Sequence, residues 1–160
     1  MKTIALSKLK EVPLEQFNVF QQTWLAALKS GKFKQTKSVL RKGGENPSFC
    51  CLGVACEVLK EELNLKMKKK RGEPYFQYNE SDIALPNIVS KSLKTENEGG
   101  LLSGIVECKS TNDYRISTLS DINDVLKWNF KQIYNLLRRA PWTVFQNFKA
   151  PKDTTVDITK

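Results

Sequence analysis

Apolar residues recur at the spacing of an α-helix between residues 12 and 30. Phe17, Trp24 and Leu28 fall on one face of such a helix, and Gly31 supplies a stop after it. Because a large aromatic side chain on an apolar face is usually buried, we expect Trp24 to anchor the core. The pattern therefore predicts a first helix that packs through its aromatic face.

Alternation of apolar and polar residues marks three short segments, 33–41, 75–79 and 104–109. Such alternation is typical of strands with one solvated face. The glycines and proline between residues 43 and 47 predict a turn after the first of these segments. We therefore expect an α+β fold with three to four helices packed on a small antiparallel sheet. A mostly α-helical domain is the alternative.

Further helices are predicted along the rest of the chain. Ser48 is a candidate cap for a helix over about residues 49–63, and a short helix is predicted over 87–93. The clearest pair of elements is a short helix over 118–125 followed by a longer one over 130–139. Asn129 is a candidate cap for the longer helix.

The chain of 160 residues is long enough for one domain with its own core. We expect a single globular domain over residues 1–149 and a polar, flexible tail over 150–160. The aromatic stretch of Trp142, Phe145 and Phe148 is expected to cover either this domain or a second subunit, so that a homo-oligomer is an open alternative.

The chain contains no histidine. This excludes Ser-His-Asp and Cys-His catalytic sites and every histidine-ligated metal centre. Lys, Asp and Glu are then the only candidate bases beside a cysteine nucleophile. We expect a protein that is not an enzyme, with no catalytic residues, no bound metal and no cofactor, and a cysteine or carboxylate enzyme is the remaining alternative.

Three of the four cysteines, Cys50, Cys51 and Cys56, lie close together. Their spacing is unlike that of zinc ribbons or knuckles, so small buried side chains are the favoured interpretation. Gly53 in the same stretch allows close approach of a backbone or a ligand. A second polar cluster includes Asp121 and Asp124 on one helical face. Capping hydrogen bonds are favoured for these aspartates over binding of a cation.

The net charge is +9, with 26 Lys and Arg against 17 Asp and Glu. A basic balance favours anionic partners such as nucleotides, nucleic acid or an acidic protein face. Nucleic-acid binding is an alternative carried by the basic run at 66–71 and by the helix over 130–139, which is expected to display polar groups outward. The candidate residues for it are Lys68, Lys69, Lys70, Arg71, Lys131, Gln132, Asn135 and Arg138.

No apolar run has the length of a signal peptide or of a membrane span. Four cysteines without a secretion signal favour free thiols in a reducing compartment. We therefore expect a cytoplasmic protein with no membrane partner.

Three separated blocks of sequence resemble a group of small bacteriophage proteins. The blocks run from Trp24 to Gly31, from Phe49 to Cys56 and from Leu119 to Asp124, and the Cys-Cys-Leu-Gly block is the most specific. The resemblance implies a phage origin and no particular activity. In place of the glycine-containing turn that is usual in that group, this chain has residues 125–128. By analogy with phage genomes, small proteins of this kind often bind and block a host component.

These observations together predict a non-enzymatic phage protein that counteracts a host defence in the host cytoplasm. It is expected either to sequester an anionic nucleotide signal or to block a host protein. In the nucleotide case, basic groups contact phosphate, an amide or carboxylate reads a base or ribose edge, and an aromatic ring stacks. The candidate ligand-binding residues are Lys34, Gln35, Lys37, Arg41, Cys50, Cys51, Tyr75, Asn123 and Asp124.

Overall fold

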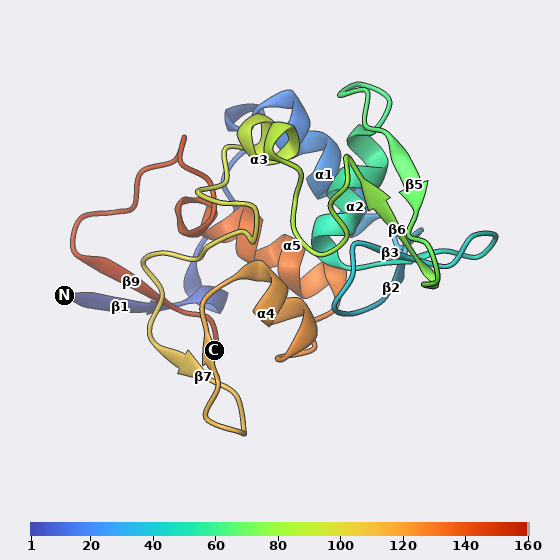
Figure 1. Cartoon of the computed structure of the whole chain (residues 1–160). Coiled ribbons are helices and arrows are strands. Elements are labelled where there is room, and N and C mark those ends of the chain that lie inside the picture. Colours follow the sequence, from blue (N-terminus) through green and yellow to red (C-terminus); the bar gives the residue numbers. More distant parts are fainter. Residues whose placement is uncertain (160) are drawn as a thin grey trace.

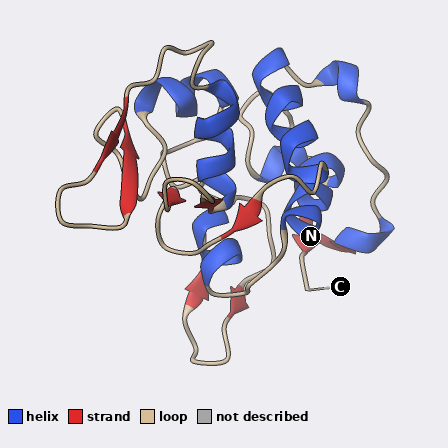
Figure 2. Cartoon of the chain, turned by 90° about the vertical axis from the view of Figure 1, so that its right-hand side faces the viewer, coloured by secondary structure: helices blue, strands red, loops and turns tan. Residues whose placement is uncertain are grey.

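The fold is α+β, as the sequence predicts. The computed structural model describes residues 1–159, which form five α-helices, short 3-10 helices and three small sheets (Figure 1). Most of the short strands lie outside the group of helices (Figure 2). The α-helices are α1 (Val19–Lys29), α2 (Cys51–Leu59), α3 (Asn87–Leu93), α4 (Leu119–Asp124) and α5 (Phe130–Arg139).

Helix α1 begins seven residues later than its apolar spacing suggests. Asn18 is the cap, because its side chain accepts from the backbone N–H of Gln21 at 2.8 Å and the Gln21 side chain accepts in return from Asn18 at 2.9 Å. This reciprocal pair satisfies two free donors of the first turn. Residues Leu14–Gln16 form a separate 3-10 helix instead.

Helix α2 is shorter than predicted at both ends, since Cys50, and not Ser48, is its cap and the helix stops at Leu59. The Cys50 sulfur accepts from the Gly53 N–H at 3.4 Å, and Ser48 belongs to a strand. Every residue from Cys51 to Cys56 is buried. The indole of Trp24 donates to the Cys51 carbonyl oxygen at 2.9 Å, which joins α1 to the first turn of α2.

The main sheet is mixed and has the strand order β2-β4-β3-β6-β5. It is mixed because β2 pairs with β4 in parallel, whereas the other neighbours pair antiparallel. Two of the predicted segments contribute to it, but the third, 104–109, does not. The strands are β2 (Lys34–Gln35), β3 (Arg41–Lys42), β4 (Ser48–Phe49), β5 (Met67–Lys69) and β6 (Tyr75–Tyr78).

Two smaller sheets lie outside the main one. Strand β7 (Cys108–Lys109), from the third predicted segment, pairs with β8 (Arg115–Ile116). Strand β1 (Lys2–Ala5) pairs in parallel with β9 (Thr154–Asp157), so that both ends of the chain meet. The tail expected to be flexible thus contains a paired strand with a buried Val156. Its last residue, Lys160, lies outside the described residues.

The aromatic C-terminal stretch covers the domain itself. Phe145 is buried, and its ring lies 6.1 Å from the rings of both Phe17 and Trp24. Phe148 packs on Phe17 with ring centroids 4.7 Å apart. These contacts close the core over α1. Among residues 1–159 we find no helix that is long and apolar enough to cross a membrane.

Candidate functional site

A basic pocket lies between the segment after β2 and the β5–β6 hairpin. Its volume is about 370 Å³. A larger hollow of about 600 Å³ lies against α5 but has only one cationic side chain in its lining, Arg139. The lining of the basic pocket consists of Thr36, Lys37, Ser38, Val39, Lys42, Lys70, Pro74, Tyr75, Asp82 and Ile83.

The lysines of this pocket differ in how they are paired. The Lys70 ammonium lies 2.7 Å from an Asp82 carboxylate oxygen and 5.5 Å from the centre of the Tyr75 ring. The hydrogen bond to Asp82 raises the pKa of Lys70. Lys37 and Lys42 are exposed, and neither has an ion-pair partner within residues 1–159. Two ammonium groups are therefore free to meet an anion.

Tyr75 provides an aromatic face beside these cations. It is half-buried, and burial together with its hydrogen bond to Glu73 raises the pKa of the hydroxyl. The phenol is therefore neutral at pH 7, and its ring presents an apolar surface to the pocket.

Residues of α4 hold the wall of the pocket formed by Thr36 and Ser38. Asn123 donates from its amide nitrogen to the Thr36 carbonyl oxygen at 3.0 Å, and Asp124 accepts from the Ser38 N–H at 3.1 Å. Ser38 has a φ of 66°, a left-handed conformation that a serine rarely adopts without support. The Asn-Asp pair thus stabilises the loop from behind.

Asn123 uses both ends of its amide for contacts within the protein. Its oxygen accepts from Gln35 at 2.8 Å and from the Cys51 N–H at 3.1 Å, while its nitrogen also donates to Asp124 at 2.7 Å. Asn123 is 1% exposed. The structure thus brings four of the predicted binding residues together, and their bonds make this cluster a scaffold for the pocket.

The thiols are buried in the same region. Burial raises the pKa of Cys50 to about 12, and it raises the pKa of Cys51 and Cys56 as well. At pH 7 these side chains are protonated. The Cys51 thiol donates to the Leu119 carbonyl oxygen at 3.7 Å, which ties α2 to α4.

Arg41 lies in the interior, although the sequence suggests a group that faces a phosphate. Its guanidinium contacts Glu57 at 3.2 Å and lies 5.6 Å and 4.9 Å from the centres of the Phe49 and Phe76 rings. Lys34 is exposed but does not line the pocket. Of the residues predicted to bind a nucleotide, only Lys37 and Tyr75 are in the lining.

Glu57 is the centre of a partly buried ionic cluster that includes Arg41. It also accepts from Lys60 at 2.6 Å and from the Tyr78 hydroxyl at 2.5 Å. Burial opposes ionisation, but these hydrogen bonds and the Arg41 charge outweigh it, so the pKa of Glu57 is lowered. The cluster fastens α2 to β3 and β6.

Lys42 is a pocket residue that sequence reasoning missed. Residues of a strand alternate between faces, so an inward Arg41 requires an outward Lys42. The structure has this arrangement, with Arg41 buried and Lys42 exposed. Asp82 and Ser38 carry no comparable local signal, because their place in the pocket depends on contacts distant in sequence.

The residues expected to bind nucleic acid are distributed unevenly. Arg138 was expected to face outward, but it is buried: it donates to Tyr134 and to the Val12 carbonyl oxygen and pairs with Glu11 at 3.1 Å. Lys70 is engaged by Asp82 in the pocket. Asn135 is half-buried, and the exposed members are Lys68, Lys69, Arg71, Lys131 and Gln132.

Asp121 and Asp124 serve different contacts. Asp121 accepts from the backbone of Ser117 at 2.8 Å and of Thr118 at 2.9 Å, which caps α4, whereas Asp124 binds Ser38. In the part of the chain that the structure describes, no three Cys, Asp or Glu side chains gather where they could hold a metal ion.

Comparison with known proteins yields a family without an assigned activity. No curated protein and no solved structure matches the chain. One family model matches residues 18–140, a span that runs from the cap of α1 to the end of α5 and includes the basic pocket. The chain therefore belongs to the family described as domain of unknown function DUF8296.

Proposed function

We propose that this protein is a non-enzymatic binder of an anionic nucleotide, and that the ligand occupies the basic pocket. The proposal depends on one observation: Lys37 and Lys42, which have no ion-pair partner among the described residues, line the same pocket as the ring of Tyr75. Phosphate forms ion pairs with ammonium groups, and a nucleobase stacks on an aromatic ring. Both halves of a nucleotide thus have a counterpart.

The size and the remaining polar groups of the pocket agree with this ligand. A volume of about 370 Å³ is at the lower end of the range of small-molecule sites, which suits a single nucleotide unit. The hydroxyls of Thr36 and Ser38 and the Asp82 carboxylate supply partners for ribose hydroxyls or a base edge. The buried, protonated thiols and the absence of histidine favour sequestration over turnover.

In a phage, a protein that captures a nucleotide signal would counteract a host defence in the host cytoplasm. The resemblance of three sequence blocks to phage proteins supports this part of the proposal. Blocking a host protein is the form of the proposal that remains if no nucleotide binds.

A thermal-shift panel tests the proposal. Cyclic mononucleotides, cyclic dinucleotides and adenosine-diphosphate-ribose are the probes, with adenosine and inorganic phosphate as partial ligands. A ligand at a hundredfold excess over its Kd stabilises by about 2.7 kcal/mol, which raises Tm by several degrees. We expect at least one nucleotide to do so, and neither partial ligand to match it.

Charge-matched variants assign the shift to the pocket. Lys37→Glu with Lys42→Glu should abolish it, whereas Lys149→Glu with Lys152→Glu, two exposed lysines outside the pocket, should retain it. A panel without any shift, or an equal loss in both double variants, contradicts the proposal.

Nucleic-acid binding is a second candidate, favoured by the exposed Lys68, Lys69 and Arg71 of the hairpin. Phosphate contacts make such binding fall steeply with salt. Lack of DNA or RNA retention in a mobility assay at low salt removes this candidate.

A further inference from the structure

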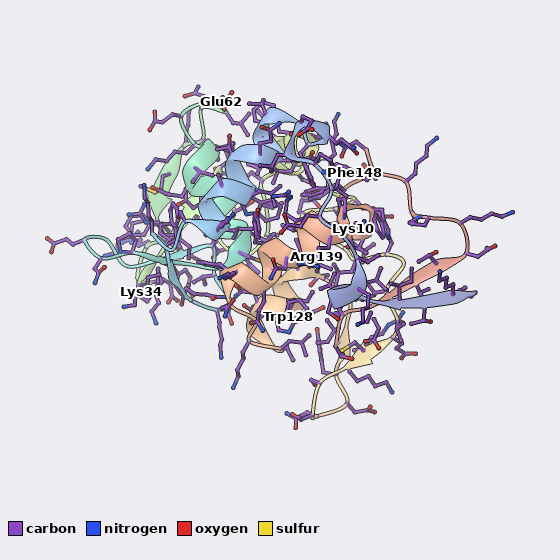
Figure 3. All side chains as sticks on the ribbon, turned by 180° about the vertical axis from the view of Figure 1, so that it is seen from behind. Lys10, Lys34, Glu62, Trp128, Arg139 and Phe148 are labelled. Carbon is purple, nitrogen blue, oxygen red and sulfur yellow. The ribbon has the colours of Figure 1, made fainter. Side chains whose placement is uncertain are left out.

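The larger hollow, of about 600 Å³, lies along α5 and shares no lining residue with the basic pocket. Its polar side is formed by Gln132, Asn135 and Arg139 of α5, separated by three and four positions, and Trp128 lies next to them just before the helix. The spacing of the three helical residues places them on one face of α5. Figure 3 shows the molecule from behind, with Trp128 and Arg139 labelled on this side of α5.

The opposite walls come from the two ends of the chain and are largely apolar. Leu6, next to β1, and Ile158, next to β9, are both buried and both line the hollow. Pairing of β1 with β9 brings them together. Leu126, in the connection between α4 and α5, extends this apolar wall.

The free polar groups of the hollow are mostly donors. The Gln132 side-chain oxygen is occupied, because it accepts from the Asn129 N–H at 2.9 Å, so its NH₂ group remains. Arg139 donates through one nitrogen to the Leu9 carbonyl oxygen at 2.7 Å, which fixes the guanidinium and leaves its other N–H groups. No hydrogen bond within residues 1–159 engages the side chain of Asn135.

Charge in the hollow is unbalanced as well. Arg139 has no carboxylate partner among the described residues, and the lining contains neither Asp nor Glu. A fixed guanidinium beside the amide groups of Gln132 and Asn135 matches a planar anion that accepts several hydrogen bonds. An apolar wall beside it matches an organic group.

We infer that this hollow is a second ligand site, specific for a small organic carboxylate with an aromatic or branched apolar body. The carboxylate binds to Arg139 and Asn135, and the apolar body packs on Leu6, Ile158 and the Trp128 ring. The site is independent of the basic pocket, whose unpaired ammonium groups suit phosphate.

The test compares an acid with its amide on the unaltered protein. 3-Phenylpropionate and 3-phenylpropionamide are titrated while the indole N–H signal of Trp128 is followed by ¹⁵N NMR, assigned with Trp128→Phe. We expect saturable movement of this signal with the acid and at least tenfold weaker binding of the amide. Equal affinities, or no movement of the signal up to millimolar acid, would overturn the assignment.

Variants locate the carboxylate. Arg139→Met keeps much of the side-chain length and should lower the affinity for the acid at least tenfold. Asn135→Ala should lower this affinity severalfold. Lys131→Ala, exposed on the same helix outside the hollow, should leave the affinity unchanged. Lys37→Glu with Lys42→Glu should also leave it unchanged, and a loss in that variant would place the acid in the basic pocket and refute the second site. Should Arg139→Met fail to fold, the acid–amide ratio and Asn135→Ala still decide.

Discussion

Gly53 of α2 packs directly against the backbone of Leu40, the residue before β3. A Cβ placed at Gly53 would overlap the Leu40 carbonyl oxygen and lie 2.9 Å from its Cα. Only glycine permits this approach. The contact positions segment 36–42, which supplies half of the pocket lining, and it gives the Cys-Cys-Leu-Gly block a structural role.

Gly53→Ala should therefore destabilise the protein by about 3 kcal/mol or more, because the backbone of Leu40 has to move out of a filled core. Helix propensity alone predicts the opposite effect, a stabilisation of the protein by about 1 kcal/mol. The sign of the change in unfolding free energy therefore distinguishes the two effects. Gly44→Ala is the control, since nothing lies near its added Cβ. Denaturant unfolding measures both, and a neutral Gly53→Ala would show that the contact is not required.

Asn123→Ala should lower the free energy of unfolding by about 2–4 kcal/mol, because it leaves the Cys51 N–H and the Thr36 carbonyl oxygen without their hydrogen-bond partner. It should also weaken nucleotide binding by releasing the loop at Ser38. Asn46→Ala, at an exposed position, serves as the control in the same unfolding experiment. If Asn123→Ala loses no more stability than the control, the hydrogen bonds of the Asn123 side chain do not hold the loop.

The lowered pKa of Glu57 predicts a specific loss of stability in acid. Above its ordinary value of 4.5 the carboxylate is ionised in both states, and the stabilisation by its partners is complete. As the pH falls below 4.5 the unfolded chain takes up the proton first, so stability declines until the pH passes the lower folded pKa. Glu57→Gln should flatten this part of the stability–pH curve.

The exposed Glu61 provides the comparison for that measurement. Glu61→Gln removes a carboxylate outside the ionic cluster, so it controls for the change in net charge alone. Equal curves for Glu57→Gln and the unaltered protein would refute a role for the ionised cluster.

The buried thiols should react slowly with a thiol reagent. Cys50, Cys51 and Cys56 are at most 5% exposed, and their raised pKa values keep them protonated at pH 8. We expect labelling on the timescale of unfolding, with fast reaction only in denaturant. Rapid labelling of Cys50 or Cys51 in the folded protein would revive the cysteine-enzyme alternative.

Local signals in the sequence predicted the parts of the fold that depend on neighbouring residues. Asn129 caps α5 as predicted, because capping acts within one turn of the helix. The two-residue strands β2 and β3 are too short for a period to be read from sequence. Strand β9 forms only because β1, at the other end of the chain, pairs with it.

The residues of the candidate site also differ in how far the sequence predicts their roles. Lys37 and Tyr75 could be predicted from charge and aromatic character. Arg41 and Arg138 could not, because each is neutralised by a partner that sequence spacing does not reveal, Glu57 and Glu11 respectively. The role of Asn123 in supporting the pocket loop depends on contacts to Gln35, Thr36 and Cys51, which are distant in sequence.

Isothermal titration of the most stabilising nucleotide into the unaltered protein and the Lys37→Glu, Lys42→Glu variant tests the central claim most directly. We predict one nucleotide per chain, and an affinity at least tenfold lower in the variant, a loss of about 1.4 kcal/mol or more. Lys149→Glu with Lys152→Glu should bind as the unaltered protein does. Absence of binding, or equal affinity in the pocket variant, would contradict the claim that the basic pocket holds a nucleotide.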